Sequence, residues 1–194
     1  MMTRSTEKLS PLVKARLAGV FWLLTILTGA FALFVGGRSG PAVNLVSTAC
    51  YLAATVLVYG LLKPVNRSLS LLAAFCSLVG CVLGASSFLL PPGARAATIA
   101  FAFFGLHCLL VGYLILRSRF LPRAVGVLMA FGGLGWLTFS VATLLSPTFA
   151  RSLSPYIMIP GILGEVSLTL WLLVVGVNVP RWNAQAGLAF PPAR

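Results

Sequence analysis

The sequence predicts an all-α, polytopic membrane protein: a bundle of six transmembrane helices with both termini in the cytoplasm. Three observations predict this fold: the composition, six long apolar runs, and the positions of the basic residues between the runs. Of the 194 residues, 59% are hydrophobic and only 8% are charged. Soluble domains carry about a quarter of charged residues. The lipid bilayer is therefore the solvent that suits this composition.

The six apolar runs are each long enough to cross a hydrocarbon core of about 30 Å as a helix. They cover residues 17–35, 42–62, 69–90, 97–116, 124–145 and 156–179. Every break between them contains a proline, a glycine or a basic residue, as is typical of helix ends. We therefore expect a single six-helix transmembrane domain over residues 1–180. A polar tail over residues 181–194 is expected to be disordered.

The basic residues predict the orientation of the chain. Fourteen Lys and Arg residues stand against two acidic residues, which gives a net charge of +12. With six spans, eleven of the basic residues fall on the side of the termini, and only Arg38, Arg95 and Arg151 fall on the other side. The positive-inside rule then places both termini in the cytoplasm. Basic residues scattered between apolar runs favour anionic lipid headgroups as partners and argue against nucleic acid.

The first apolar run has an alternative interpretation. A basic segment precedes it, and Ala30-Phe31-Ala32 resembles the cleavage site of a signal peptide. The run continues through Val35, however, and is then long enough to span the membrane. We expect it to be retained as the first transmembrane helix.

The cysteines and the single histidine argue against a metal centre. Cys50, Cys76, Cys81 and Cys108 all lie within apolar runs and form no CxxC motif. Unpaired cysteines in such segments usually behave as small hydrophobic residues. A zinc site built from Cys and His is not expected, and no cofactor is indicated. We expect all four cysteines to remain reduced thiols.

Two ionisable residues within the predicted spans, Glu165 and His107, form the candidate polar interior site. An acidic residue in the bilayer costs about 2.5 kcal/mol or more, so it should face the bundle interior and have a partner. Helical rise places the two residues at similar depth, about one turn apart. They would form a functional pair that handles a proton or binds a ligand. Alternatively, Glu165 is neutral and makes only a structural hydrogen bond.

Other small or polar residues could support this site or the packing around it. Thr25, Thr28 and Ser167 are the candidate supporting residues, although Ser and Thr in spans commonly bond back to their own helix. Gly80 and Gly84 form a GxxxG motif, which allows helices to approach closely. Packing within the chain is the first interpretation of that motif, and a homo-oligomer is the second.

Several segments resemble a known family. The segments are FFGLH at residues 103–107, GYLILRSRFLPR at 112–123 and GEVSL at 164–168, with RLAG at 16–19 near the start. They resemble the bacterial integral-membrane family catalogued as domain of unknown function forty-three eighty-six. The resemblance implies a compact multi-pass protein of the bacterial cytoplasmic (inner) membrane and brings no activity with it. His107 and Glu165 both lie within its motifs. The outer loop at residues 36–42 is shorter than the family pattern implies.

Three classes of function fit the sequence. The first is a non-enzymatic, multi-pass membrane protein with a polar interior site that binds or moves a small solute or a proton. The second is an intramembrane enzyme acting on a lipid or isoprenoid, with Glu165 as general acid. The third is a structural or accessory subunit of a membrane assembly. No nucleotide-binding loop, HExxH motif or nucleophile elbow favours an enzyme, so catalytic residues cannot be assigned from the sequence.

Overall fold

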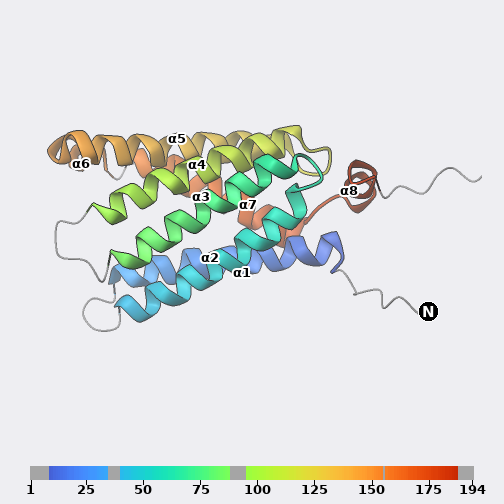
Figure 1. The fold of residues 1–194 in the computed structure, drawn as a ribbon, viewed down its shortest axis with the longest axis horizontal. Helices are drawn as coiled ribbons and strands as arrows, with labels where there is room; N and C mark the ends of the chain where they lie inside the picture. Colours follow the sequence, from blue (N-terminus) through green and yellow to red (C-terminus); the bar gives the residue numbers. More distant parts are fainter. Residues whose placement is uncertain (1–8, 35–39, 88–94, 155, 188–194) are drawn as a thin grey trace, which may run out of the picture.

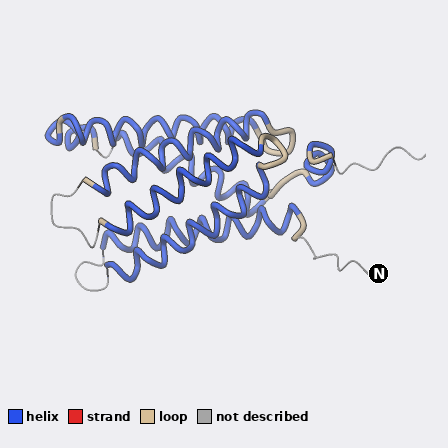
Figure 2. The backbone as a smooth tube through the Cα atoms, viewed as in Figure 1, coloured by secondary structure: helices blue, strands red, loops and turns tan. Residues whose placement is uncertain are grey.

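A computed structural model describes residues 9–34, 40–87, 95–154 and 156–187. All regular structure in these residues is helical (Figure 2). Six of the helices are long and apolar enough to cross a membrane. This confirms the predicted all-α, six-span fold. The loop at residues 36–39, which the sequence marked as short, lies outside the described residues.

The helices follow the predicted spans closely. The membrane-spanning helices are α1 (Pro11–Phe34), α2 (Gly40–Leu62), α3 (Arg67–Ser86), α4 (Ala96–Arg117), α5 (Arg123–Leu145) and α7 (Ile159–Val174). Two short helices complete the fold, α6 (Pro147–Leu153) and α8 (Val179–Gln185), with a 3₁₀ turn at Tyr156–Met158 before α7.

The six long helices form a closed ring. Each long helix packs against the next one in the chain, and α7 closes the ring by packing against both α5 and α1. Because the helices alternate in direction, α1 begins at the same end of the bundle at which α8 lies (Figure 1). Short links join α2 to α3 and α4 to α5 at this end. We call it the basic end: it holds the start of α1, these two links and α8.

Two helix boundaries differ most from the sequence prediction. Helix α1 begins six residues early, at Pro11, where the Ser10 hydroxyl accepts a hydrogen bond from Val13 N at 3.3 Å. The last span ends early, at Val174, because Gly176 adopts a positive φ of 75° that terminates the helix.

Residues 181–185, which the sequence analysis assigned to the polar tail, belong to α8. The Trp182 side chain of this helix is buried, and its Nε1 donates to Leu61 O at 2.9 Å. That bond satisfies a carbonyl in the last turn of α2. Residues 188–194 lie outside the described part of the chain.

Glycines set the closest helix contacts. Gly105 faces Gly133 across α4 and α5, and two turns further along Gly112 faces Gly126. A Cβ added to any of these four residues would lie within 3.0 Å of the facing backbone. Lipid supplies no hydrophobic drive between helices, so such close backbone packing contributes much of the association. In the GxxxG motif, Gly80 meets the Phe104 ring, whereas Gly84 has open space beside it.

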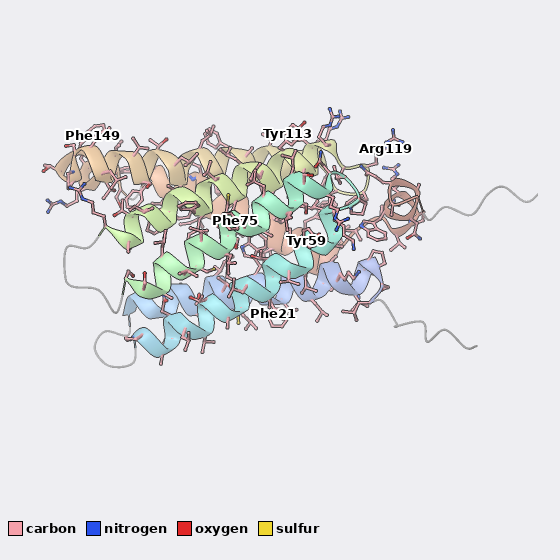
Figure 3. The ribbon with its side chains drawn as sticks, in the orientation of Figure 1. Phe21, Tyr59, Phe75, Tyr113, Arg119 and Phe149 are labelled. Carbon is pink, nitrogen blue, oxygen red and sulfur yellow. The ribbon has the colours of Figure 1, made fainter. Side chains whose placement is uncertain are left out.

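The outer surface is apolar, as a lipid-facing surface requires. Phe75 and Tyr113 project from it (Figure 3), with 58% and 47% of their side chains exposed. The cysteines belong to the spans. All four are free in the structure.

Candidate functional site

Glu165 lies on α7 with its carboxylate turned into the bundle. Oε2 accepts a hydrogen bond from Trp22 Nε1 of α1 at 3.2 Å, and Oε1 accepts one from Trp136 Nε1 of α5 at 3.0 Å. Both indoles are buried, with 1% and 9% of their surface exposed. The geometry thus agrees with the expectation that this acid faces inward and has a polar partner.

Glycines on α5 and α7 make room for this arrangement. Gly161 lies one turn before Glu165 on the same face of α7, and the Trp136 ring occupies the space that a Cβ there would need. Gly132 and Gly135 let the backbone of α5 approach the start of α7. On its other side Trp136 stacks on Phe101, with ring centroids 5.3 Å apart. Packing on both sides therefore fixes the position from which the indole donates to the carboxylate.

The carboxylate has a third hydrogen-bond donor. Cys108 Sγ lies 3.9 Å from Oε1 and donates to it as a weak thiol donor. Indole N–H groups donate only. The two indoles therefore suit a carboxylate, and the Cys108 sulfur is the one weak acceptor among the three groups around it. In the described residues, none of the hydrogen bonds to this carboxylate comes from Lys or Arg.

His107 does not bond to Glu165. Its Nδ1 lies 2.8 Å from Ala73 O of α3, and the ring is almost completely buried. Successive residues of a helix point about 100° apart. Because Cys108 is directed toward Glu165, the preceding His107 is directed toward α3 instead. In place of the expected His107–Glu165 hydrogen bond, His107 bonds to α3, and Glu165 accepts from α1, α4 and α5.

The bond to Ala73 fixes the chemistry of the imidazole. A carbonyl oxygen only accepts, so Nδ1 carries the hydrogen. Nε2 is buried and has no hydrogen-bond partner in the described residues, and the same holds for the Tyr51 hydroxyl on α2. The Tyr51 and His107 rings are in edge contact, with centroids 5.9 Å apart. Two unpaired polar atoms thus lie on neighbouring side chains.

Trp22 connects these two groups of residues. Its indole N–H reaches Glu165, while its ring contacts Tyr51 and His107 at centroid distances of 5.6 and 6.0 Å. We call this set of side chains the polar core; its members are Trp22, Tyr51, His107, Cys108, Trp136 and Glu165. It draws on five of the six spans, α1, α2, α4, α5 and α7.

The three candidate supporting residues lie outside the polar core. Thr25 donates to Phe21 O at 2.9 Å, Thr28 to Leu24 O at 2.6 Å, and Ser167 to Gly164 O at 2.8 Å. Each bond returns to the residue's own helix, as hydroxyls in spans commonly do. Thr25 also lies 3.4 Å from Ser47 O, which links α1 to α2.

Sequence reasoning missed Trp22, Trp136 and Cys108 as neighbours of Glu165. A signal for the two tryptophans was present. An indole N–H in the middle of a span needs an acceptor, and Glu165 is the single acid among the spans. Cys108 carries no such signal. In the described residues, no group of three or more His, Cys, Asp and Glu side chains is placed to hold a metal ion.

The polar core is densely packed. Of five pockets in the described residues, one is lined by His107 and none by Glu165. The gap that His107 lines between α2, α3 and α4 has no room for a water molecule. A groove of about 660 Å³ opens sideways between α2 and α3, lined by apolar residues such as Leu71 and Phe75. No member of the polar core lines it.

Together these features define a polytopic α-helical membrane protein whose core holds one acidic side chain between indole donors. Residues 93–176 match the family described as "Domain of unknown function (DUF4386)". This match confirms the resemblance seen in the sequence. It covers His107, Cys108, Trp136 and Glu165, whereas Trp22 and Tyr51 precede it.

One curated relative and the solved structures complete the comparison. The chain is 25% identical over 125 residues to an uncharacterized protein of Archaeoglobus fulgidus, covering 62% of this chain and 74% of the relative. No solved structure matches the chain. The relative's description assigns no activity, so function has to be argued from the polar core.

Proposed function

We propose that the polar core is a proton-exchange site, with Glu165 as the group that takes up and releases the proton. The protein would use this exchange to move a proton, alone or with a small solute, across the bacterial cytoplasmic membrane. One observation carries the proposal. A carboxylate that accepts from hydrogen-bond donors lies inside the bundle, and its partner Trp22 contacts two side chains whose buried polar atoms have no partner among the described residues.

The dense packing favours a proton over a larger solute. A solute needs a cavity at the carboxylate, and none of the five pockets is lined by Glu165. A proton needs only a chain of donors and acceptors. In its neutral form, His107 Nε2 has a free lone pair, and the Tyr51 hydroxyl both donates and accepts. These two atoms are the proposed relay partners on α2 and α4.

Proton uptake would change the packing of three helices. Glu165 on α7 holds α1 and α5 through its two indole bonds. Hydrogen bonds to a charged acceptor contribute about 1.5–3 kcal/mol, against about 1 kcal/mol for neutral pairs. Neutralising the carboxylate would weaken both bonds at once, so that α1 and α5 could move relative to α7. Such coupling is what a transport cycle requires.

A structural role is the second candidate, and the same bonds favour it. Through its indole and thiol partners Glu165 joins α7 to α1, α4 and α5. In this case the carboxylate would remain charged throughout and would act only as a cross-link. The intramembrane enzyme has less support, because the lateral groove between α2 and α3 is not lined by Glu165 or by any other member of the polar core.

The charge distribution supports the proposed orientation. Among the described residues, eight basic side chains belong to the basic end: Lys14, Arg16, Lys63, Arg67, Arg117, Arg119, Arg123 and Arg181. Only Arg95 and Arg151 belong to the other end. By the positive-inside rule the basic end faces the cytoplasm, together with both termini.

Proton flux into liposomes tests the proposal. The purified protein is reconstituted with a trapped pH-sensitive dye, and a potassium gradient with valinomycin supplies the driving voltage. Wild-type protein should acidify or alkalinise the lumen according to the sign of the voltage. The Glu165→Gln variant should not. However, its amide NH₂ would face an indole N–H, so it also disturbs packing.

A double variant separates chemistry from packing. Combining Glu165→Gln with Trp136→Phe removes the facing N–H, so the amide oxygen can still accept from Trp22. If this variant keeps its thermal stability but loses the flux, Glu165 acts through its proton. Flux that persists in the folded double variant would overturn the proposal. Wild-type protein without flux would also overturn it and leave the cross-link as the role of Glu165. Ser167→Ala is the control, because Ser167 bonds only to its own helix.

A further inference from the structure

We propose that the basic end carries a binding site for the phosphate group of an anionic phospholipid. The site is a pocket of about 420 Å³ lined by Arg117, Arg119 and Arg123, together with Val65, Leu116, Ser118 and Gln185. We call it the arginine pocket. It is independent of the polar core and of the function proposed for Glu165.

The backbone around the arginine pocket is held in place by α8. Arg119 N donates to Gln185 Oε1 at 3.0 Å, and Gln185 Nε2 lies 3.5 Å from Arg117 O. A third bond runs from Asn178 N to Phe120 O at 3.2 Å. These bonds fix the link between α4 and α5 against the last helix. These bonds therefore fix the backbone that carries the three arginines.

Among the described residues, the arginines of this pocket have no acidic residue to pair with. The acid within these residues is Glu165, which lies in the polar core. All three guanidinium groups belong to exposed residues at the end of the bundle, where Figure 3 labels Arg119. Guanidinium groups bind phosphate through paired N–H donors. A phosphate anion would therefore supply the negative charge that the described part of the chain does not place at this pocket.

The position of the pocket favours a lipid as the source of that phosphate. Arg117 ends α4 and Arg123 begins α5, so the pocket lies where two apolar spans leave the membrane. Lipid headgroups occupy this level. A neighbouring pocket of about 410 Å³ shares Arg119 and adds Arg181 and Trp171. The mixture of guanidinium groups and an aromatic ring is typical of the membrane interface.

Lipid binding to the full-length protein tests the proposal by native mass spectrometry. The probes are phosphatidylglycerol and phosphatidylcholine added to the detergent-solubilised protein, with inorganic phosphate as a competitor. The pocket variant replaces Arg117, Arg119 and Arg123 by glutamine. The control variant replaces Arg16, Lys63 and Arg67 by glutamine, which removes the same charge at the same end from residues that line neither pocket.

We expect wild-type protein to prefer phosphatidylglycerol, and the pocket variant to bind it about tenfold more weakly or worse. The control variant should lose less than about threefold. Equal losses in both variants would overturn the proposal, because attraction would then be diffuse. Complete displacement of the lipid by inorganic phosphate at matched concentration would overturn the lipid as the ligand. A version with three lysines in the pocket keeps the charge and the fold; full binding by it would show that paired guanidinium donors are not required.

Discussion

The indole of Trp136 lies where a side chain on Gly161 would be. A Cβ at Gly161 would collide with three atoms of that ring. The same indole donates to Glu165 one turn further along α7, at 3.0 Å. A residue without a side chain thus determines whether the acid of the polar core keeps one of its partners.

Replacing Gly161 by alanine should displace Trp136 and lengthen its bond to Glu165. We expect a loss of about 1–3 kcal/mol of stability, the usual cost of overpacking, measured as a lower thermal midpoint in detergent. Tryptophan fluorescence should shift as the indole moves. Gly84→Ala is the matched control, because that glycine has nothing within 4 Å. An equal effect of the two substitutions would contradict the packing described for Trp136.

Glu165→Gln and Trp136→Phe should be strongly non-additive. Each single substitution is expected to cost about 1–3 kcal/mol, since it leaves a buried polar group without its partner. Together they should cost less than the sum by about 0.5–3 kcal/mol, because the facing N–H groups are no longer opposed. Thermal or chemical unfolding of the four proteins in the cycle measures the coupling.

A second cycle with Trp182→Phe provides the control for this prediction. Trp182 donates to Leu61 and makes no bond to Glu165. Its substitution should therefore add to Glu165→Gln within about 0.5 kcal/mol. Additivity in the Trp136 cycle as well would show that the indole and the carboxylate do not interact.

The imidazole of His107 should be protonated at Nδ1 in its neutral form. The reason is the 2.8 Å bond to Ala73 O, which can only accept. Nitrogen NMR of histidine-labelled protein distinguishes the two tautomers by the chemical shifts of the ring nitrogens. His107→Asn should retain the bond better than His107→Gln, because the asparagine amide lies nearer the position of Nδ1. A ring protonated only at Nε2 would contradict the assignment.

Reporter fusions should locate the basic end in the cytoplasm. Fusions after Arg67 and Arg123 should give cytoplasmic signals, and fusions near Arg95 and Arg151 should give external ones, since basic links are retained inside. A reversed result at all four positions would leave the six-helix fold intact and overturn the orientation. A mixed result would instead contradict the span assignment.

The sequence predicted the fold well because hydropathy and helix length are local properties. It predicted that Glu165 faces inward because exposing an isolated acid to lipid is energetically costly. It paired Glu165 with His107 wrongly because helical rise gives depth but not rotation. One residue along, Cys108 faces the carboxylate instead. The depth argument therefore identified the correct turn of α4 but not the residue on that turn that faces Glu165.

The end of the last span shows a second limit of sequence reasoning. Residues 175–179 continue the apolar run, so hydropathy extends the helix through them. The helix stops at Val174 because of the backbone conformation of Gly176, which a hydropathy scale does not measure. Trp182 follows this break, and its buried indole donates to Leu61 O.

The contact between Trp182 and Leu61 has a consequence for the order of assembly. Synthesis delivers α8 only after all six spans. Until then the carbonyl of Leu61 has no indole donor, and the link between α4 and α5 lacks its hydrogen bonds to Gln185. A nascent chain cut before residue 179 would contain every span and still lack these contacts at one end of the bundle. Membrane quality-control proteases would have that end by which to distinguish it from the finished protein.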